Sequence, residues 1–244
     1  MGRKKKDAIA DALEEIFATT YGVREYFGNG LAYIRQMTGG EIYKDNKFIG
    51  KTKVDPIESY QNGGLFPVLV EKRANGMRFY QFMNGDGELV GDKFWSGTIG
   101  YDKFGFARVQ MGIETYKDEE GKVHPVLDKW GKQIPVYAYL KKNGKKVSYV
   151  DENGKRKPFY FNAATFVDRK TGIAKVKPRG EDYFTYINLK TGQYYPHKFR
   201  DCADCSRDGL FLVQLYDTGV KKLMGAKDGT LYNYNSKEDL YWEK

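Results

Sequence analysis

The chain has 244 residues and a formal net charge of +9 at pH 7, with 41 Lys or Arg against 32 Asp or Glu. Its length allows a buried core without staples, and two cysteines are too few for a disulfide framework. No apolar run approaches the roughly 18 residues of a membrane span, and acidic residues interrupt the opening stretch where a signal peptide needs an apolar core. We expect a cytoplasmic protein whose charge favours polyanions or acidic proteins as partners.

The first 22 residues predict a basic tail and a helix. Residues 1–6 contain the run Arg3-Lys4-Lys5-Lys6, which is either a solvated end or a contact for phosphate or acidic protein. Residues 7–22 predict an amphipathic α-helix with Asp7 as N-cap and Gly22 as its stop. One face of this helix is apolar: Ile9, Leu13, Ile16, Phe17 and Tyr21. The helix either caps the first sheet edge or docks onto a partner.

Residues 23–235 contain a pattern of glycine, apolar, small, any and apolar residue. It occurs as GLAYI at Gly30, GLFPV at Gly64, GFARV at Gly105, GIAKV at Gly172 and GLFLV at Gly209, with VYAYL at Val136 as a copy that lacks the glycine. The copies recur about every 36 residues, a period typical of repeat architectures.

A second set of signals keeps step with the first. Turn pairs occur at Asp45-Asn46, Asp86-Gly87, Glu120-Gly121, Asn153-Gly154, Thr191-Gly192 and Asp228-Gly229. Alternating aromatic segments such as the one with Phe79, Tyr80 and Phe82 precede several of them, as strands that feed hairpin turns do. The sequence therefore predicts an all-β fold: a tandem array of about six β-meander repeats, an open twisted solenoid or a propeller-like ring, behind a short N-terminal α-helix.

An eight-residue frame also recurs, as DEEGKVHP at 118–125, DKWGKQIP at 128–135 and DENGKRKP at 151–158, and its back half closes as GQYYP at 192–196. The glycine supplies the positive φ of a hairpin turn. The proline four residues later cannot donate to a ladder, so we expect it to end the outgoing strand.

These frames resemble the WG (KWG) repeat of bacterial and phage-associated proteins. The best-matching stretch is AYLKKNGKKVSYVDENGKRKP, residues 138–158, and the resemblance spans about residues 26–235. The family's Trp-Gly pair occurs once, at Trp130-Gly131, in the turn frame instead of mid-strand. The resemblance implies binding or structural modules and transfers no catalytic residues.

One group of residues has the types and spacing of metal ligands: His197, Cys202 and Cys205. Structural zinc takes four ligands, and only Asp201 or Asp204 could complete this set. The repeat register offers a simpler explanation, because the two cysteines fall near the places of Thr165 and Asp168, or of Ala164 and Val167. We expect two small packing residues, no metal and no cofactor.

Catalytic signals are sparse. His124 and His197 are the only imidazole bases, and the chain has no G-x-S-x-G elbow. The triplet Gly85-Asp86-Gly87 leads into a strand and predicts a hairpin turn, not a phosphate loop. We expect a protein that is not an enzyme.

Basic residues gather around two neighbouring turns: Lys141, Lys142, Lys145, Lys146, Lys155, Arg156 and Lys157. With Tyr149, Phe159 and Tyr160 nearby, they could follow a nucleic-acid backbone and stack bases, or contact an acidic partner. The alternative is a solvated face of a lysine-rich protein.

The sequence thus predicts non-catalytic recognition of a protein, or a structural role in a larger bacterial or phage assembly, a phage-encoded inhibitor included. A phage-encoded protein would act in the host cytoplasm or the virion. The rival class is a basic nucleic-acid-binding module. Residues 236–244 form a tail in which Tyr241 and Trp242 could pair back onto the array.

Overall fold

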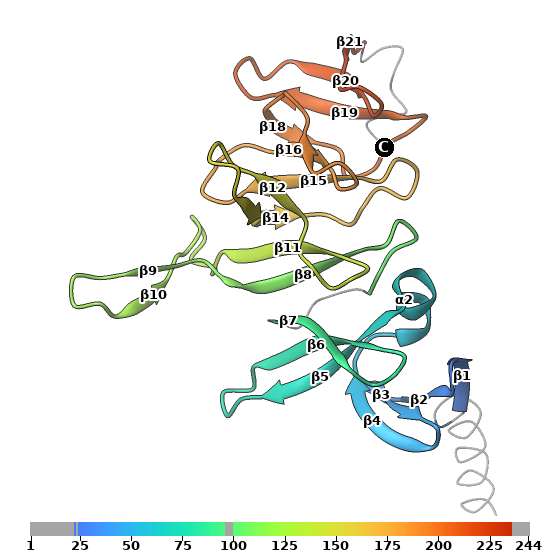
Figure 1. Ribbon diagram of the computed structural model, residues 1–244. Coiled ribbons are helices and arrows are strands. Elements are labelled where there is room, and N and C mark those ends of the chain that lie inside the picture. The colour runs from blue at the N-terminus through green and yellow to red at the C-terminus, as the bar shows by residue number, and fades with distance from the viewer. Residues whose placement is uncertain (1–21, 23, 96–99, 236–244) are drawn as a thin grey trace, which may run out of the picture. The chain divides into compact units, whose positions relative to one another are not determined.

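A computed structural model describes residues 22, 24–95 and 100–235 of the protein. This part of the chain is mostly β-strand, in antiparallel sheets, with one short helix (Figure 1). The expected all-β class is confirmed for it. Apart from Gly22, the helix expected over 7–22 lies outside the described residues, as do the tails 1–6 and 236–244. No helix in the described part is long and apolar enough to cross a membrane.

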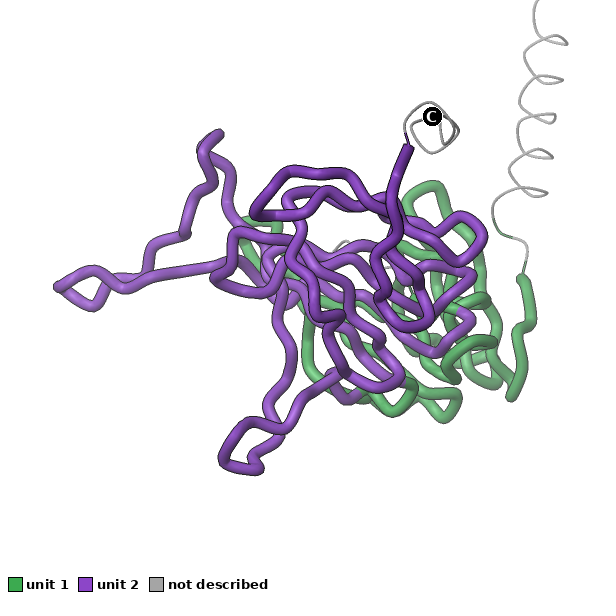
Figure 2. The backbone as a smooth tube through the Cα atoms, turned by 90° about the horizontal axis from the view of Figure 1, so that it is seen from above, with its two compact units in different colours: residues 1–102, 142–144 green, residues 103–141, 145–244 purple. Residues whose placement is uncertain are grey.

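The chain divides into two compact units (Figure 2). The first comprises residues 1–102 and 142–144, and the second comprises residues 103–141 and 145–244.

The first unit contains a four-stranded antiparallel sheet and a three-stranded segment, each with its strands paired in chain order. Its elements are β1 (Arg24–Gly28), β2 (Leu31–Gln36), β3 (Gly39–Lys44), β4 (Lys47–Thr52), α2 (Pro56–Gly63), β5 (Leu65–Lys72), β6 (Arg78–Asn84) and β7 (Leu89–Trp95). Leu31, Ile42 and Phe66 are fully buried between them and form the centre of one apolar core.

Helix α2 has strong start and stop residues in the sequence, but the repeat pattern did not predict a helix there. The Asp55 carboxylate accepts the Ile57 N–H at 2.9 Å, Pro56 occupies the first helical position, and Gly64 follows the helix with φ 70°. The buried Ser59 hydroxyl donates to the Leu65 carbonyl at 2.7 Å and ties the helix to β5.

The second unit is built around six strands, β8, β11, β14, β15, β16 and β17, which pair in that order, and a four-stranded sheet, β18 to β21. Two separate hairpins, β9–β10 and β12–β13, complete it. The bounds are β8 (Phe106–Ile113), β9 (Thr115–Lys117), β10 (Val123–Pro125), β11 (Pro135–Lys141), β12 (Ser148–Val150), β13 (Arg156–Pro158), β14 (Phe161–Ala164), β15 (Ile173–Pro178), β16 (Thr185–Asn188), β17 (Gln193–Tyr194), β18 (Phe199–Cys202), β19 (Leu210–Leu215), β20 (Lys221–Gly225) and β21 (Leu231–Asn233).

The strands β14–β17 and β18–β21 share their irregularities as well as their order. In both, the register between the first two strands shifts after a buried phenylalanine, Phe161 in one and Phe199 in the other. In both, a backbone N–H just beyond the second strand donates to the carbonyl before that phenylalanine, Arg179 to Tyr160 and Tyr216 to Lys198, each at 3.1 Å. Ala164 and Cys202 therefore occupy equivalent places, each opposite a buried valine.

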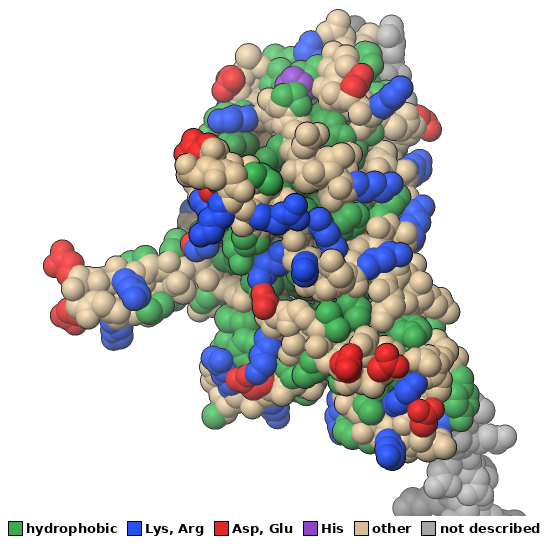
Figure 3. Space-filling view, in the orientation of Figure 1, with side chains coloured by type: hydrophobic (Ala, Val, Ile, Leu, Met, Phe, Trp, Pro, Cys, Tyr) green, Lys and Arg blue, Asp and Glu red, His purple; other side chains and the backbone are tan. Residues whose placement is uncertain are grey.

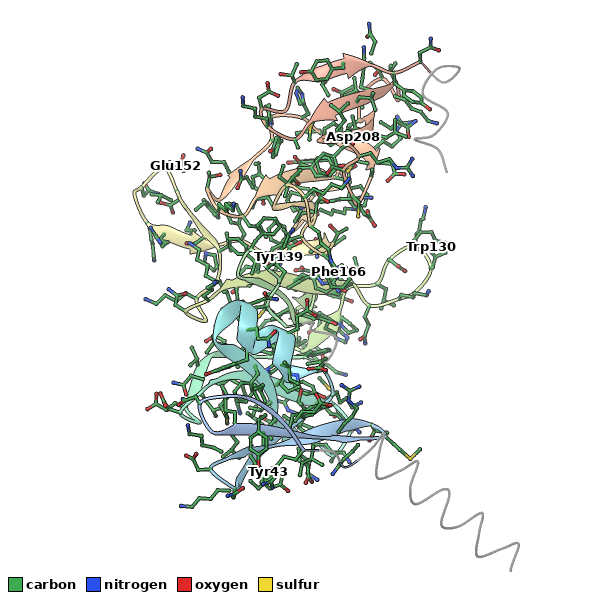
Figure 4. All side chains as sticks on the ribbon, turned by 90° about the vertical axis from the view of Figure 1, so that its right-hand side faces the viewer. Tyr43, Trp130, Tyr139, Glu152, Phe166 and Asp208 are labelled. Carbon is green, nitrogen blue, oxygen red and sulfur yellow. The ribbon has the colours of Figure 1, made fainter. Side chains whose placement is uncertain are left out.

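Successive groups of strands in this unit are also joined in the same way. The Tyr139 hydroxyl of β11 donates to the Thr165 carbonyl at 2.5 Å, and the Tyr186 hydroxyl of β16 donates to the Ala203 carbonyl at 2.6 Å. A cation adds a second bond at each joint: Arg108 donates to the Ala164 carbonyl, and Lys175 donates to the Cys202 carbonyl. Aromatic side chains fill both joints, as Tyr139 shows in Figure 4.

The glycines that open the repeat pattern share one backbone conformation. Gly30, Gly64, Gly105, Gly172 and Gly209 each have φ between 69° and 81°, and a strand starts at the next residue. The expected turn pairs also contain positive φ values. A residue with a Cβ is strained in this region, which explains glycine at the five positions.

The sixth copy, at Val136, is not confirmed as a separate repeat. Strand β11, which contains Val136, pairs directly with β8, the strand that follows Gly105. It holds the place beside β8 that β16 holds beside β15, and its Tyr139 makes the bond that Tyr186 makes. Two of the predicted turn pairs, Glu120-Gly121 and Asn153-Gly154, accordingly lie on the separate hairpins.

The expected role of proline holds at two frames and fails at one. Pro125 and Pro158 are the last residues of β10 and β13. Pro135, by contrast, is the first residue of β11. A strand's first residue needs no ladder donor, so proline is tolerated there too.

Asp168 forms a buried polar link between the loops that precede β15 and β19. Its carboxylate accepts the Thr171 hydroxyl at 2.5 Å and the Ser206 hydroxyl at 2.7 Å, and Asp168 and Ser206 are each 4% exposed. Burial raises the pKa of Asp168, but these hydrogen bonds outweigh burial and hold the pKa below its usual value.

Because this pKa is depressed in the folded state, the stabilisation is present above the ordinary carboxyl pKa and is lost as the pH falls through the folded value. We expect Asp168→Asn to lower the free energy of unfolding by about 1–3 kcal/mol at neutral pH. The difference from the wild type should shrink below about pH 4 in urea titrations. Asp217→Asn, at an exposed position, serves as the control. A difference that stays constant down to the acid limit would contradict this assignment.

Candidate binding surfaces on two projecting hairpins

Two segments of the second unit run out from its sheets in different directions (Figure 2). We call residues 114–134 the Trp130 arm and residues 148–158, which form β12–β13, the basic hairpin. In Figure 4, Trp130 and Glu152 lie at the ends of these segments. No residue of the Trp130 arm is buried. The arm therefore adds nothing to a core.

The Trp130 arm is closed at its base by backbone hydrogen bonds. Glu114 N–H donates to the Ile134 carbonyl at 2.7 Å, Val126 N–H to the Glu114 carbonyl at 2.9 Å, and Ile134 N–H to the Val126 carbonyl at 3.1 Å. Two hairpins leave this base: β9–β10, and a shorter one in which Leu127 pairs with Gln133.

The Glu114 side chain fixes this base to the body of the unit. Its carboxylate accepts three hydrogen bonds from the Arg179 guanidinium, at 2.5 Å, 2.8 Å and 3.0 Å, and one from the Asn162 amide at 3.2 Å. The Arg179 bonds hold the pKa of Glu114 below its usual value. The arm thus has a defined direction.

We expect Glu114→Gln to loosen the arm without unfolding the protein. Glutamine loses the charge-assisted pair with Arg179, but the pair is partly exposed, so the free energy of unfolding should fall by less than about 1 kcal/mol. Amide hydrogen exchange within residues 115–133 should become about tenfold faster, while exchange in β15 stays unchanged. Glu120→Gln, at the arm's tip, is the matched control. Identical exchange in wild type and Glu114→Gln would refute the anchoring role.

The turns at the ends of the hairpins share one construction. Asp118, Asp128 and Asp151 each accept, on one carboxylate oxygen, the N–H of the residue four positions later at 2.8 Å. The glycine three positions after each of them has positive φ and donates its N–H to the aspartate carbonyl. This is a hairpin turn with a glycine bulge, and it explains the D-x-x-G-K motif.

Large apolar side chains are exposed along the Trp130 arm. Trp130 is 72% exposed, and Tyr116, Val123 and Leu127 are each more than half exposed. The Lys129 ammonium lies over the Trp130 ring at 4.4 Å. His124 stacks on Tyr116 and contacts the Asp118 carboxylate at 2.6 Å, and this contact lowers the pKa of Asp118.

The basic hairpin carries three of the seven predicted basic residues. Lys155, Arg156 and Lys157 are all exposed, and Lys157 pairs with Asp151 at 2.8 Å. On β12, Tyr149 is 40% and Val150 is 60% exposed. Tyr149 and Tyr194 both contact the ring of Phe159, with centroids 4.8 Å and 5.0 Å away.

The other four predicted lysines surround the turn after β11. Lys142 and Lys145 are exposed, whereas Lys141 and Lys146 are half-buried. Lys146 lies over the Tyr160 ring at 5.8 Å, which places it near the base of the basic hairpin. Lys142 belongs to the first unit. Figure 3 shows a band of Lys and Arg side chains over β11, β12 and β14.

The structure does not assemble His197, Cys202 and Cys205 into a metal site. The described residues contain no group of three or more His, Cys, Asp or Glu that could hold a metal. The His197 ring nitrogen contacts the Gly229 carbonyl at 3.0 Å, Cys205 is exposed, and Cys202 is buried in a core with Tyr186 and Phe211. Burial raises the pKa of the Cys202 thiol to about 12, so this side chain is a packing residue.

Three features escaped the sequence analysis. The Glu114–Arg179 pair joins residues far apart in the chain, and nothing in either local sequence points to the other. The joints made by Arg108 and Lys175 were also missed, although both residues stand three positions after a repeat glycine. That shared place is a signal that could have found them.

The predicted hairpin turn at Gly85-Asp86-Gly87 is confirmed between β6 and β7.

Comparisons with known proteins add little. No family model matches the chain, and no curated protein matches it significantly. Solved structures do match, and one is titled "Crystal structure of Nidogen/Laminin Complex". It is 10% identical, the match covers 84% of this chain and 76% of that chain, and the TM-score is 0.25. A likeness at that level carries no argument about fold or function.

Proposed function

We propose that the protein is a non-catalytic β-repeat protein that binds an acidic protein partner, either as part of a larger assembly or as an inhibitor. One observation supports this most strongly. Two ordered hairpins project from the sheets and present basic and apolar side chains to solvent. Side chains held out in this way are typical of binding surfaces.

The proposed scaffold is an array of five modules that start at Gly30, Gly64, Gly105, Gly172 and Gly209. Each module continues through a strand pair to a turn with positive φ, and the spacing from Gly172 to Gly192 equals that from Gly209 to Gly229. The Trp130 arm is then an insertion in the third module, and the basic hairpin follows that module. Insertions in repeat proteins commonly carry binding. The resemblance to the WG repeat agrees with this proposal.

The absence of catalysis is part of the proposal because the described contacts of both histidines are structural. His124 contacts a turn aspartate and a tyrosine ring, and His197 contacts a backbone carbonyl and the ring of Phe199. Neither contact pairs a base with a nucleophile.

The test is affinity capture from host extract with immobilised protein, followed by titration calorimetry against each purified candidate. The proposal expects an acidic protein that binds with a dissociation constant in the micromolar range or tighter. Turnover of a small substrate by the pure protein, abolished by one point substitution, would overturn the proposal.

Nucleic-acid binding is the second candidate, favoured by Lys146 over Tyr160 and by the aromatic cluster around Phe159 beside Lys157. Fluorescence anisotropy against heparin, DNA and RNA at two salt concentrations separates the candidates. Tight binding of DNA or RNA with a steep salt slope, which Lys141→Glu/Lys142→Glu/Lys145→Glu/Lys146→Glu abolishes, favours nucleic acid. No binding at low salt removes this candidate.

A further inference from the structure

The shorter hairpin of the Trp130 arm holds a large apolar side chain in solvent at a fixed place. The Asp128 carboxylate accepts the N–H of Trp130 at 2.9 Å and that of Lys132 at 2.8 Å. Asp128 N–H donates to the Lys132 carbonyl at 2.7 Å, and Gly131 N–H donates back to the Asp128 carbonyl at 3.0 Å. The backbone at Trp130 is therefore ordered before any partner arrives, which lowers the entropic cost of binding.

The charges of this hairpin define the partner. Lys129 and Lys132 are exposed on either side of Trp130, whereas Asp128 is engaged by the turn. An exposed indole with lysines one residue before it and two residues after it is complementary to an apolar pocket rimmed by carboxylates.

Two other occupants fit less well. A second copy of the chain carries the same net charge of +9 and would be repelled. An anionic bilayer is charged over a wide plane and would also meet and repel Glu119 and Glu120, which are exposed at the end of the neighbouring hairpin on the same arm, whereas a protein pocket needs to meet only the hairpin of Trp130.

We propose that Trp130, flanked by Lys129 and Lys132, is the apolar anchor that inserts into a carboxylate-rimmed pocket of an acidic protein partner. This inference rests on the proposed function and adds a second contact, distinct from the basic hairpin. The arm supplies an apolar contact, and the basic hairpin supplies charge.

The test uses two labelled polymers of equal length, poly-glutamate and a random copolymer of glutamate and phenylalanine. Wild-type protein should bind the copolymer about tenfold more tightly or better, because only the copolymer offers apolar groups among carboxylates.

Trp130→Ala should bind the two polymers equally, and its circular dichroism melt should match the wild type because the side chain is exposed. Phe48→Ala removes an exposed aromatic residue of the first unit and should keep the preference. The contribution of Trp130 to the fluorescence emission is the difference between wild type and Trp130→Ala. This contribution should shift to shorter wavelength when the copolymer binds the wild type.

Several results would overturn the inference. One is an equal affinity of the wild type for both polymers, and another is a preference that survives Trp130→Ala. Binding of phosphatidylserine vesicles that Trp130→Ala abolishes, without any preference for the copolymer, would assign the arm to a lipid surface. Dimerisation in sedimentation equilibrium that Trp130→Ala abolishes would assign it to a second copy. If Lys155→Glu/Arg156→Glu/Lys157→Glu leaves poly-glutamate binding unchanged, the proposed function fails; if that variant weakens binding to both polymers but no copolymer preference exists, the anchor alone fails.

Discussion

Reversing the charge of the basic hairpin with Lys155→Glu, Arg156→Glu and Lys157→Glu together is expected to weaken binding to an acidic probe about 100-fold or more at low salt. Arg156 and Lys157 are exposed on β13, and Lys155 is exposed directly before it, so the change replaces a local attraction with a local repulsion. Fluorescence anisotropy with labelled poly-glutamate at about 50 and 200 mM salt measures both the affinity and its salt slope. The slope should become shallower in the variant.

The matched control is Lys47→Glu/Lys51→Glu/Lys53→Glu, which changes the net charge equally on exposed positions of the first unit. This control should lose less than about threefold, because screening limits the reach of exposed charges to about 10 Å. An equal loss in both variants would show that net charge, and not the basic hairpin, governs binding. Circular dichroism checks that the charge-reversed hairpin leaves the sheets intact.

Phe161→Ala is expected to lower the free energy of unfolding by about 3–5 kcal/mol. The Phe161 side chain is fully buried in the second unit and contacts the rings of Tyr139 and Phe159, at centroid distances of 5.7 Å and 6.0 Å. Its loss leaves a cavity that strands on both sides cannot close without breaking their pairing. Urea unfolding followed by circular dichroism measures the change.

Phe199→Ala should lose a similar amount, because Phe199 stands at the same register shift in the next set of strands and is also fully buried. Trp130→Ala is the exposed aromatic control and should change stability by less than about 0.5 kcal/mol. If Phe199→Ala is as stable as wild type while Phe161→Ala is destabilised, the strands β14–β17 and β18–β21 are not equivalent.

Features that depend on only a few neighbouring residues could be predicted from the sequence. Gly121, Gly131 and Gly154 have positive φ, as the eight-residue frame predicted. Such positions are readable because the steric preference of glycine acts within one or two residues. A packing place for Cys202 was also predicted from register, and the structure aligns it with Ala164, one of the two places considered. The same prediction was wrong for Cys205, which is exposed.

Long-range pairing was not readable. Val136 resembles a repeat start because a buried strand after a turn has the same local composition wherever it pairs. The turns at Gly121 and Gly154 have the same construction as the turn between β6 and β7, where Asn84 takes the place of the aspartate and Gly87 that of the glycine. The sequence therefore could not distinguish a projecting hairpin from one within a larger sheet. For the same reason the basic residues could be listed but not sorted into Lys141 and Lys146, which are half-buried, and Lys155, which is exposed.

The closed base of the Trp130 arm means that the β8–β11 hairpin does not depend on what is attached to it. Ile113 and Pro135 already face each other as ladder partners, so a two-residue Asn-Gly connection could join them directly. Natural variation, or a designer, could exchange residues 114–134 for a segment of another length and specificity while the strands below keep their pairing. The β8–β11 hairpin is in this sense an acceptor position for grafted loops.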